Sequence, residues 1–305
     1  MDGGVCAGRF ALIKDEKLND YVQVAFFEAD WGLENLSTAI KMKARQLFTE
    51  ATKIVVGVCG HLNYAAGFLA NKFREPPVFG LPYNPPYYLE YFQEMDEREL
   101  VSFRFSNQQF FDLRKQGKLM PDIGKIRLRH LDKSNLKRDV EIYTKLNNQC
   151  FPEHPYWSDR TSEEDYELFH PFRWLLKEEN LIIAEDQGRP VGFLLWYPDF
   201  NQLVEGGQEL SISQVLKYHL LNPVDTVRLT EIAVIPEYRR KGVVQAMVAD
   251  MTDSLARGNY KYTEGGFIFS ENKASIGITS LLLQKAFGKP VKPYRRFVVF
   301  DGNLS

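Results

Sequence analysis

The chain has 305 residues, of which 44% are hydrophobic and 26% charged, and its formal net charge is -2. This length favours two domains, and the composition is typical of a globular protein with a sizeable core rather than a disordered chain. The near-neutral charge gives no general signal for nucleic-acid binding. The cysteines, Cys6, Cys59 and Cys150, are far apart and odd in number, which indicates neither a disulfide framework nor a zinc site.

The first residues show no basic segment followed by an apolar core, and no apolar run approaches the roughly 18 residues needed to cross a bilayer. Neither a secretory leader nor a membrane span is therefore expected. Together with the cysteine pattern, this predicts a cytoplasmic protein without a membrane partner.

The first part of the chain predicts four strands and two helices. β-branched and aromatic runs divided by a polar turn predict an N-terminal hairpin, and apolar residues at helical spacing follow it. A long segment rich in glycine, proline and aromatic residues precedes the last two elements. The predicted strands are 8–14, 21–27, 53–58 and 99–105, and the predicted helices are 35–50 and 89–94.

A polar stretch over residues 110–123 contains Gly117 and Pro121 and separates this first part from a second one. We therefore predict two domains, residues 1–116 and 117–305. In the second, an insertion over 198–223 interrupts the pattern. The predicted strands there are 125–130, 181–185, 191–197, 229–235, 260–269 and 294–300, and the predicted helices are 135–148, 163–176, 245–257 and 272–287.

One strand, turn and helix in the second part carry most of the chemical information. Pro236 ends the strand, and three basic residues with one glycine lead into the helix; they are Arg239, Arg240, Lys241 and Gly242. The first N–H groups of a helix have no internal partner. With the helix dipole and the cations, they suit a pyrophosphate. Taken alone, the same segment fits a solvated basic turn that caps an ordinary helix equally well.

The strand ending in Val-Ile-Pro-Glu-Tyr-Arg-Arg-Lys-Gly resembles the acetyl-CoA signature of the GNAT acyltransferases, in which Arg or Gln is followed after two residues by Gly. Arg239 and Gly242 match that signature. The element order β-α-α-β-β-β-α-β-α-β of the second part resembles the same family, and so do the turn into Val191-Gly192-Phe193 and the run Asn272-Lys273-Ala274-Ser275. The resemblance implies an α/β fold with a mixed sheet. The first part resembles a truncated second half of the same kind, without the signature, and no CoA is expected there.

The resemblance also implies a site. In this family the fourth and fifth strands separate, and the arm of the cofactor lies between them, against the fourth strand. The residues implied to bind acetyl-CoA or another acyl-CoA are Ile232, Ala233, Val234, Arg239, Arg240, Lys241, Gly242, Val243, Val244, Asn272 and Ser275. No metal is implied.

Two positions depart from the family pattern. Val244 stands where a small residue is usual, and its β-branched side chain narrows the approach of a phosphate to the backbone. Thr279 stands where family members often have a tyrosine as the general acid, and Ser270, Ser275 or a water is an alternative donor. For the base we consider Glu231, since a carboxylate in an otherwise apolar strand needs a reason. A buried salt bridge of Glu231 to Arg228 or Arg295 is the alternative.

The leading hypothesis is a CoA-dependent N-acyltransferase in which a primary amine, on a small molecule or a peptide, attacks acetyl-CoA directly at the second domain. A binding or scaffold protein that has kept the fold without efficient chemistry is the alternative, favoured by Val244 and Thr279. Transfer of aminoacyl groups from a charged tRNA is a third hypothesis, and the near-neutral charge argues against it. The acceptor and the oligomeric state are not encoded in any pattern of the sequence.

Overall fold

The computed structural model describes residues 6–204, 206 and 210–304. One mixed sheet runs through the whole molecule in the order β1-β2-β3-β11-β5-β10-β9-β8-β7-β6, and the short β4 pairs with β11. The strands are β1 (Gly8–Ile13), β2 (Tyr21–Ala29), β3 (Lys53–Val56), β4 (Phe68–Leu69), β5 (Asp96–Ser106), β6 (Ile126–His130), β7 (Leu181–Asp186), β8 (Arg189–Pro198), β9 (Thr226–Val234), β10 (Tyr262–Phe269) and β11 (Arg296–Asn303).

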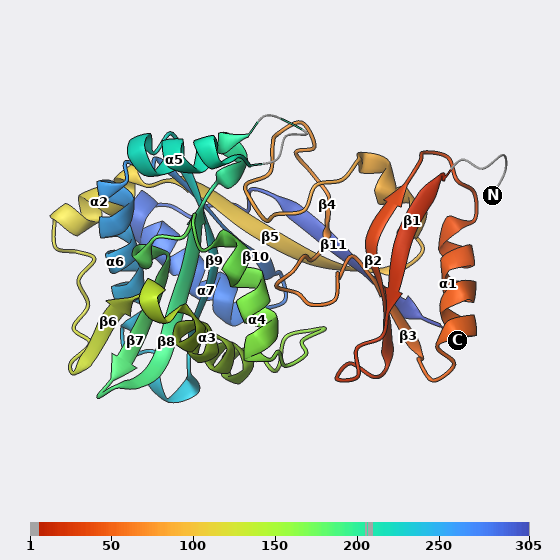
Figure 1. Cartoon of the computed structure of the whole chain (residues 1–305), viewed down its shortest axis with the longest axis horizontal. Helices are drawn as coiled ribbons and strands as arrows, with labels where there is room; N and C mark the ends of the chain where they lie inside the picture. Colours follow the sequence, from red (N-terminus) through yellow and green to blue (C-terminus); the bar gives the residue numbers. More distant parts are fainter. Residues whose placement is uncertain (1–5, 205, 207–209, 305) are drawn as a thin grey trace.

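The helices lie at the two ends of this sheet, with one at the N-terminal end and six around the C-terminal part (Figure 1). They are α1 (Leu36–Leu47), α2 (Gln108–Lys115), α3 (Leu136–Cys150), α4 (Ser162–Phe169), α5 (Ile212–Leu221), α6 (Val243–Arg257) and α7 (Lys273–Phe287). The predicted order of elements in the second part is confirmed, with α5 added between β8 and β9. The fold is therefore the mixed α/β arrangement expected from the sequence.

Four helical segments differ from their prediction. The helix expected over 89–94 is replaced by two 3₁₀ turns, Pro86–Tyr88 and Glu90–Phe92. The helix expected over 163–176 is shorter, because α4 ends at Phe169 and Pro171, which has no N–H to donate, follows in a short 3₁₀ turn. The insertion over 198–223 contains α5, and the polar stretch over 110–123 contains most of α2. Both missed helices are short and carry many polar or exposed residues.

Strands β5 and β11 connect the two ends of the molecule (Figure 1). β5, from the first part of the sequence, lies between β10 and β11 and is antiparallel to both. β11, the last strand, pairs with β3 on its other side. Each end of the sheet is thus completed by a strand from the other part of the chain. The boundary between residues 116 and 117 stays a prediction, and it divides a continuous sheet.

The core has several parts. The largest surrounds β6 to β9 with α3 and α6, and it includes the fully buried Trp196. A second cluster packs β2, β3 and α1 against Val298 and Phe300 of β11. A third lies between β5 and the helices α2, α6 and α7. Because β5 and β11 contribute to separate clusters, the same two strands tie the cores as well as the sheet together.

Candidate functional site

The centre of the candidate site is the place where β9 and β10 separate. These parallel strands pair from Thr226 opposite Tyr262 to Leu229 opposite Gly265, and their pairing ends there. Beyond that point β9 stays paired with β8, and β10 stays paired with β5. A β-bulge at Thr230, between Glu231 and Leu229 in the register with β8, marks the start of the separation. The residues implied to line a cofactor arm, Ile232, Ala233 and Val234, lie just beyond this bulge.

The basic turn follows the end of β9. Pro236–Tyr238 forms a 3₁₀ turn, Arg240 and Gly242 have left-handed φ angles of 64° and 79°, and α6 begins at Val243. Left-handed residues of this kind turn successive N–H groups toward one side of a loop and so favour an anion. Arg239, Arg240 and Lys241 are all exposed. The expected strand, turn and helix are therefore present, with the cations accessible to solvent.

Two of the three cations have contacts within the protein. Arg239 donates from Nε to the carbonyl oxygen of Val234 over 3.1 Å. The Nζ of Lys241 lies 4.6 Å from the centre of the Tyr238 ring, and the Tyr238 hydroxyl donates to Asp186 over 2.7 Å. These contacts hold the turn against the end of the strand without burying its charges.

Val244, which stands where the family pattern usually has a small residue, lies in a closely packed helix start. Val244 is half-buried and packs against the largest core cluster, while Val243 is fully buried. Gly242 lies against the segment before β6, where an added Cβ would come within 3.1 Å of Pro121 Cβ. Gly242 is thus required both by its positive φ and by close packing.

Glu231 lies on β9 directly after the bulge and accepts hydrogen bonds from three neutral donors. Tyr143 donates from its hydroxyl at 2.8 Å and 2.9 Å from the two carboxylate oxygens, and Asn147 Nδ2 is 2.8 Å from Oε2. The third donor, Asn63 Nδ2, is 2.9 Å from Oε1 and comes from the first part of the chain. The carboxylate is therefore held in one orientation by groups from both parts.

The alternative prediction, a salt bridge from Glu231 to Arg228 or Arg295, is wrong for both arginines. Arg295 pairs with Glu264 over 3.1 Å, and both side chains are fully buried. Arg228 donates from Nε to the carbonyl oxygen of Gly266 and from Nη1 to that of Phe79, both at 3.4 Å. The acceptors for these arginines lie in loops and strands that no pattern in the sequence links to Arg228 or Arg295.

The sequence analysis missed the three donors to Glu231. Tyr143 and Asn147 are four residues apart on α3 and so share one face of that helix, and both are fully buried. Two polar residues on the apolar face of one helix indicate a buried polar partner, and this signal could have predicted the contact. Asn63 lies in a loop where no periodic pattern indicates a direction.

His61 supports Asn63 from within the same loop. Its Nδ1 accepts the backbone N–H of Asn63 at 3.1 Å, and its Nε2 is 3.0 Å from the carbonyl oxygen of Ser158. These two contacts fit the neutral tautomer with the proton on Nε2. Burial lowers the pKa of His61 to about 3, so the ring stays neutral. The Trp157 ring packs edge-on against it, which closes the loop over the site.

The predicted residues at the start of α7 form a helix cap. Asn272 accepts the backbone N–H of Ser275 at 3.0 Å through Oδ1, which satisfies one of the free donors of the helix. Its Nδ2 is 3.1 Å from Nε2 of His154, in the aromatic loop after α3. Thr279, one turn further along, is half-buried. The cap explains Asn272 and Ser275 structurally and leaves their role in cofactor binding a prediction.

Residues 6–204, 206 and 210–304 contain no helix that is both long and apolar enough to cross a membrane. Within those same ranges, no group of three or more His, Cys, Asp or Glu side chains is placed to hold a metal ion.

Comparison with known proteins matches one part of the chain to a family. Residues 140–280 match the model of the acetyltransferase (GNAT) family. The protein YghO of Escherichia coli (strain K12) is 22% identical over 259 residues, and the match covers 81% of this chain and 65% of that relative. The matched region thus spans slightly less than two thirds of that relative's length.

Two solved structures show the same fold over nearly the whole chain. A tandem GNAT protein from the clavulanic acid biosynthesis pathway has a TM-score of 0.55 at 12% identity, and the match covers 100% of this chain and 81% of that one. A GCN5-related N-acetyltransferase from Sphaerobacter thermophilus has a TM-score of 0.53 at 12% identity, covering 98% and 77%. At such identities the likeness shows the fold alone. Residues 140–280 thus match the acetyltransferase (GNAT) family, and the chain as a whole has the fold of tandem GNAT proteins.

Proposed function

We propose that this protein is a CoA-dependent N-acyltransferase that moves an acetyl group from acetyl-CoA to a primary amine, with its site in residues 117–305. The observation that carries the proposal is the separation of β9 and β10 directly before an exposed cationic turn at the start of α6. Unpaired backbone groups of a separated strand suit the amide-bearing arm of CoA. The N–H groups of residues 240–244 and the three cations suit its pyrophosphate.

In the proposed reaction the amine nitrogen attacks the thioester carbon, and the bond from that carbon to sulfur breaks. One proton leaves the nitrogen, and one proton goes to the departing thiolate. Glu231 is the proposed acceptor of the first proton, because it lies on β9 beside the separation. Its three donors are neutral and hold the carboxylate in one orientation without forming an ion pair with it.

Three hydroxyl groups at or near the start of α7 are candidates for the donor to the thiolate. Ser270 donates to Glu99 over 2.9 Å, and the backbone N–H of Ser275 is used in the cap of α7. The hydroxyls of Thr279, Ser270 and Ser275 all have too high an intrinsic pKa to act as efficient acids. We propose that a water molecule in exchange with solvent relays this proton to the thiolate.

Calorimetric titration of the full chain with acetyl-CoA tests cofactor binding. The double variant Arg239→Glu/Arg240→Glu should lose saturable binding, since two charge reversals repel a pyrophosphate. Lys41→Glu/Lys43→Glu on α1 makes the same change in charge at the other end of the molecule and should bind normally. Failure of the wild-type chain to bind any CoA ester would overturn the proposal.

A non-catalytic binding protein is the second candidate, and one observation favours it. The carboxylate of Glu231 is engaged by three protein donors, which is the arrangement of a structural group as well as of an oriented base. Release of CoA with a panel of amines separates the candidates. Turnover that falls at least tenfold in Glu231→Gln supports the enzyme, while CoA binding without turnover on any amine supports the binding protein.

A further inference from the structure

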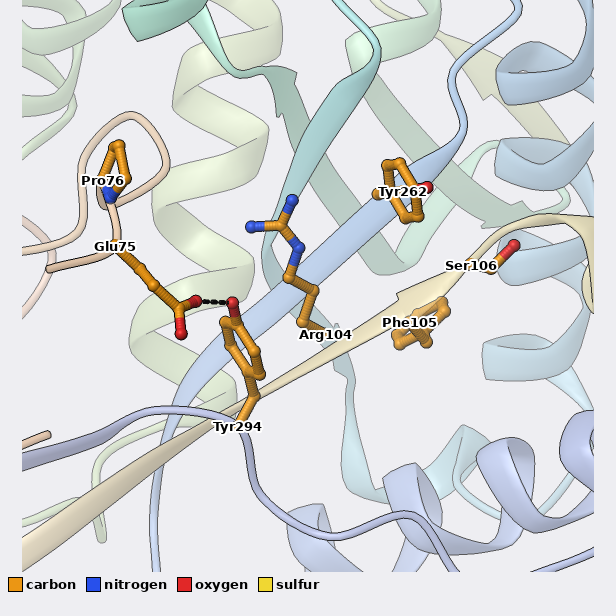
Figure 2. Close-up of a pocket in the computed structure, with 7 residues that line it drawn as sticks. All are labelled: Glu75, Pro76, Arg104, Phe105, Ser106, Tyr262 and Tyr294. Carbon is orange, nitrogen blue, oxygen red and sulfur yellow. Dashed lines mark hydrogen bonds between the residues drawn. The ribbon is translucent and has the colours of Figure 1, made fainter. Parts of the chain in front are cut away.

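A second concave site lies where the two parts of the chain meet, away from the turn at α6. Its cavity of about 470 Å³ is lined by residues from the loop before β5, from β5 and β10, and from the segment before β11 (Figure 2). The lining residues are Glu75, Pro76, Arg104, Phe105, Ser106, Tyr262 and Tyr294. None of them belongs to the residues proposed to bind CoA or to transfer protons.

Arg104 is the charged group at the centre of this cavity. Figure 2 shows its side chain rising from β5 between the rings of Tyr294 and Tyr262. The guanidinium carbon is 5.6 Å from the centre of each ring. Among the hydrogen bonds of the described residues, none uses the Arg104 guanidinium as a donor. The planar group is thus flanked by two aromatic rings while its N–H groups keep their capacity to donate.

The carboxylate behind Arg104 is shared and does not neutralise the cluster. Glu264 is fully buried, and its Oε1 accepts from Ser102 Oγ at 2.8 Å and from Arg295 Nε at 3.1 Å. Its Oε2 lies 3.9 Å from Arg104 Nη1, beyond hydrogen-bond distance, and has no hydrogen-bond partner of its own among the described residues. One negative charge therefore faces two guanidinium groups.

A third guanidinium increases this excess. Arg228, which faces Glu264 across the β9 and β10 pairing, is buried and donates to two backbone carbonyl oxygens. Arg104, Arg228 and Arg295 thus lie around the buried carboxylate of Glu264, and of these four side chains Arg104 lines the cavity. Because charges interact more strongly away from water, the positive charge that Arg104 brings to the cavity favours an anion.

The residues at the rim of the cavity indicate which kind of anion it would bind. Glu75 accepts from Lys72 Nζ at 2.7 Å and from the Tyr294 hydroxyl, so this acidic group stands opposite Arg104 with a cation of its own. A multiply charged anion would be repelled by Glu75 more than a singly charged one. The flat fork of a guanidinium matches a carboxylate, which accepts two parallel hydrogen bonds from it.

We propose that this cavity is a binding site for a small monocarboxylate, held by a two-bond contact to Arg104 and enclosed by the rings of Tyr262 and Tyr294. The residues that line the cavity and the three donors that hold Glu231, which are Tyr143, Asn147 and Asn63, have no member in common. The site is therefore separate from the proposed base, and its existence does not depend on acyl transfer.

Calorimetric titration of the full chain at low salt tests this site with three probes, which are benzoate, its uncharged analogue benzamide, and inorganic phosphate. Wild-type protein should bind benzoate saturably and at least tenfold more tightly than benzamide or phosphate. Arg104→Gln should reduce benzoate binding to the level of benzamide. Arg127→Gln, at an exposed position on β6, is the matched control and should bind benzoate as the wild type does.

Two further variants keep the test decisive if Arg104→Gln does not fold. Arg104→Lys keeps the charge without the fork and should weaken benzoate binding several-fold, and Tyr262→Ala, at a residue 40% exposed, should do the same. Absence of saturable benzoate binding, equal affinity for benzamide, or tighter binding of phosphate overturns the proposal. So does benzoate binding that all the folded variants of the cavity leave unchanged.

Discussion

Asn63 Nδ2 donates a hydrogen bond of 2.9 Å to Glu231 Oε1 across 168 residues of sequence. Asn63 belongs to a loop of the first part of the chain, and Glu231 belongs to β9 of the second. The first part, which lacks the CoA signature, thus helps to orient the carboxylate at the centre of the candidate site. His61 fixes the loop in turn through the backbone N–H of Asn63.

Asn63→Ala should destabilise the protein by about 1.5–3 kcal/mol, the usual range for a hydrogen bond to a charged group. Asn63→Asp should destabilise it more at neutral pH, because it places a second carboxylate beside Glu231. Urea unfolding at pH 7 measures both. Asn19→Ala, in an exposed turn, is the control and should stay within about 0.5 kcal/mol of wild type. Equal stability of Asn63→Ala and Asn19→Ala would show that the contact contributes nothing.

The strand, turn and helix at the candidate site were predictable because their signals are local. Pro236 cannot continue the strand, and Gly242 takes the left-handed conformation from which α6 begins. The helix α5 was predictable too, since Ser211 and Gln214 form a capping box that the sequence displays.

The contacts between the two parts were not predictable in this way. The pairing of β5 with β10 and β11 depends on register between strands far apart in sequence, and alternation within one strand names no partner. The partners of Glu231 show the same limit, since its donors come from α3 and from a loop. The apolar pattern of the strand predicted that the Glu231 carboxylate needs hydrogen-bond or charged partners. It could not identify the groups that supply them.

Gly242→Ala should destabilise the protein and weaken binding of acetyl-CoA. The backbone φ of 79° is strained for any residue with a Cβ, and the added carbon would lie 3.1 Å from Pro121 Cβ. Gly117→Ala is the matched control, because its φ of 69° is also positive and its Cβ would meet nothing within 4 Å. Thermal unfolding should show the larger loss in Gly242→Ala, and calorimetry should show weakened CoA binding in that variant alone. Similar losses in both variants would contradict a role of close packing at Gly242.

Asp199 should make the stability of the protein fall as pH rises. It is 6% exposed, and burial raises its pKa from 3.8 to about 6 although the Phe79 N–H donates to it. The folded state therefore holds the proton more tightly than the unfolded chain. Its contribution is fully present below about pH 4 and is lost as pH rises through about 6, amounting to at most about 3 kcal/mol.

Asp199→Asn tests this dependence, because the amide oxygen can still accept from Phe79 and carries no charge. Urea unfolding at pH 4 and pH 7 measures the free energy of unfolding of both proteins. The difference between them should shift in favour of Asp199→Asn from pH 4 to pH 7. Asp20→Asn, at an exposed turn, should show no such gain. A difference between Asp199→Asn and wild type that is the same at both pH values would exclude titration of Asp199 as the cause.

The exchange of β5 and β11 should make the two parts of the chain fold as one unit. Residues 117–305 expressed alone lack β5, so β10 and β11 lose the strand between them and Val101 and Phe103 leave the cluster beneath α7. That fragment should show no cooperative unfolding transition, whereas the full chain should unfold in one.

Phe300→Ala in the full chain tests the same coupling from β11. Its fully buried ring packs in the N-terminal cluster, and its loss should cost about 3–5 kcal/mol. In a background where Trp31, Trp157 and Trp174 are replaced by Phe, circular dichroism and the fluorescence of Trp196 in the C-terminal core should then report the same lowered midpoint. A fluorescence midpoint that stays at the wild-type value would mean that the two ends unfold independently.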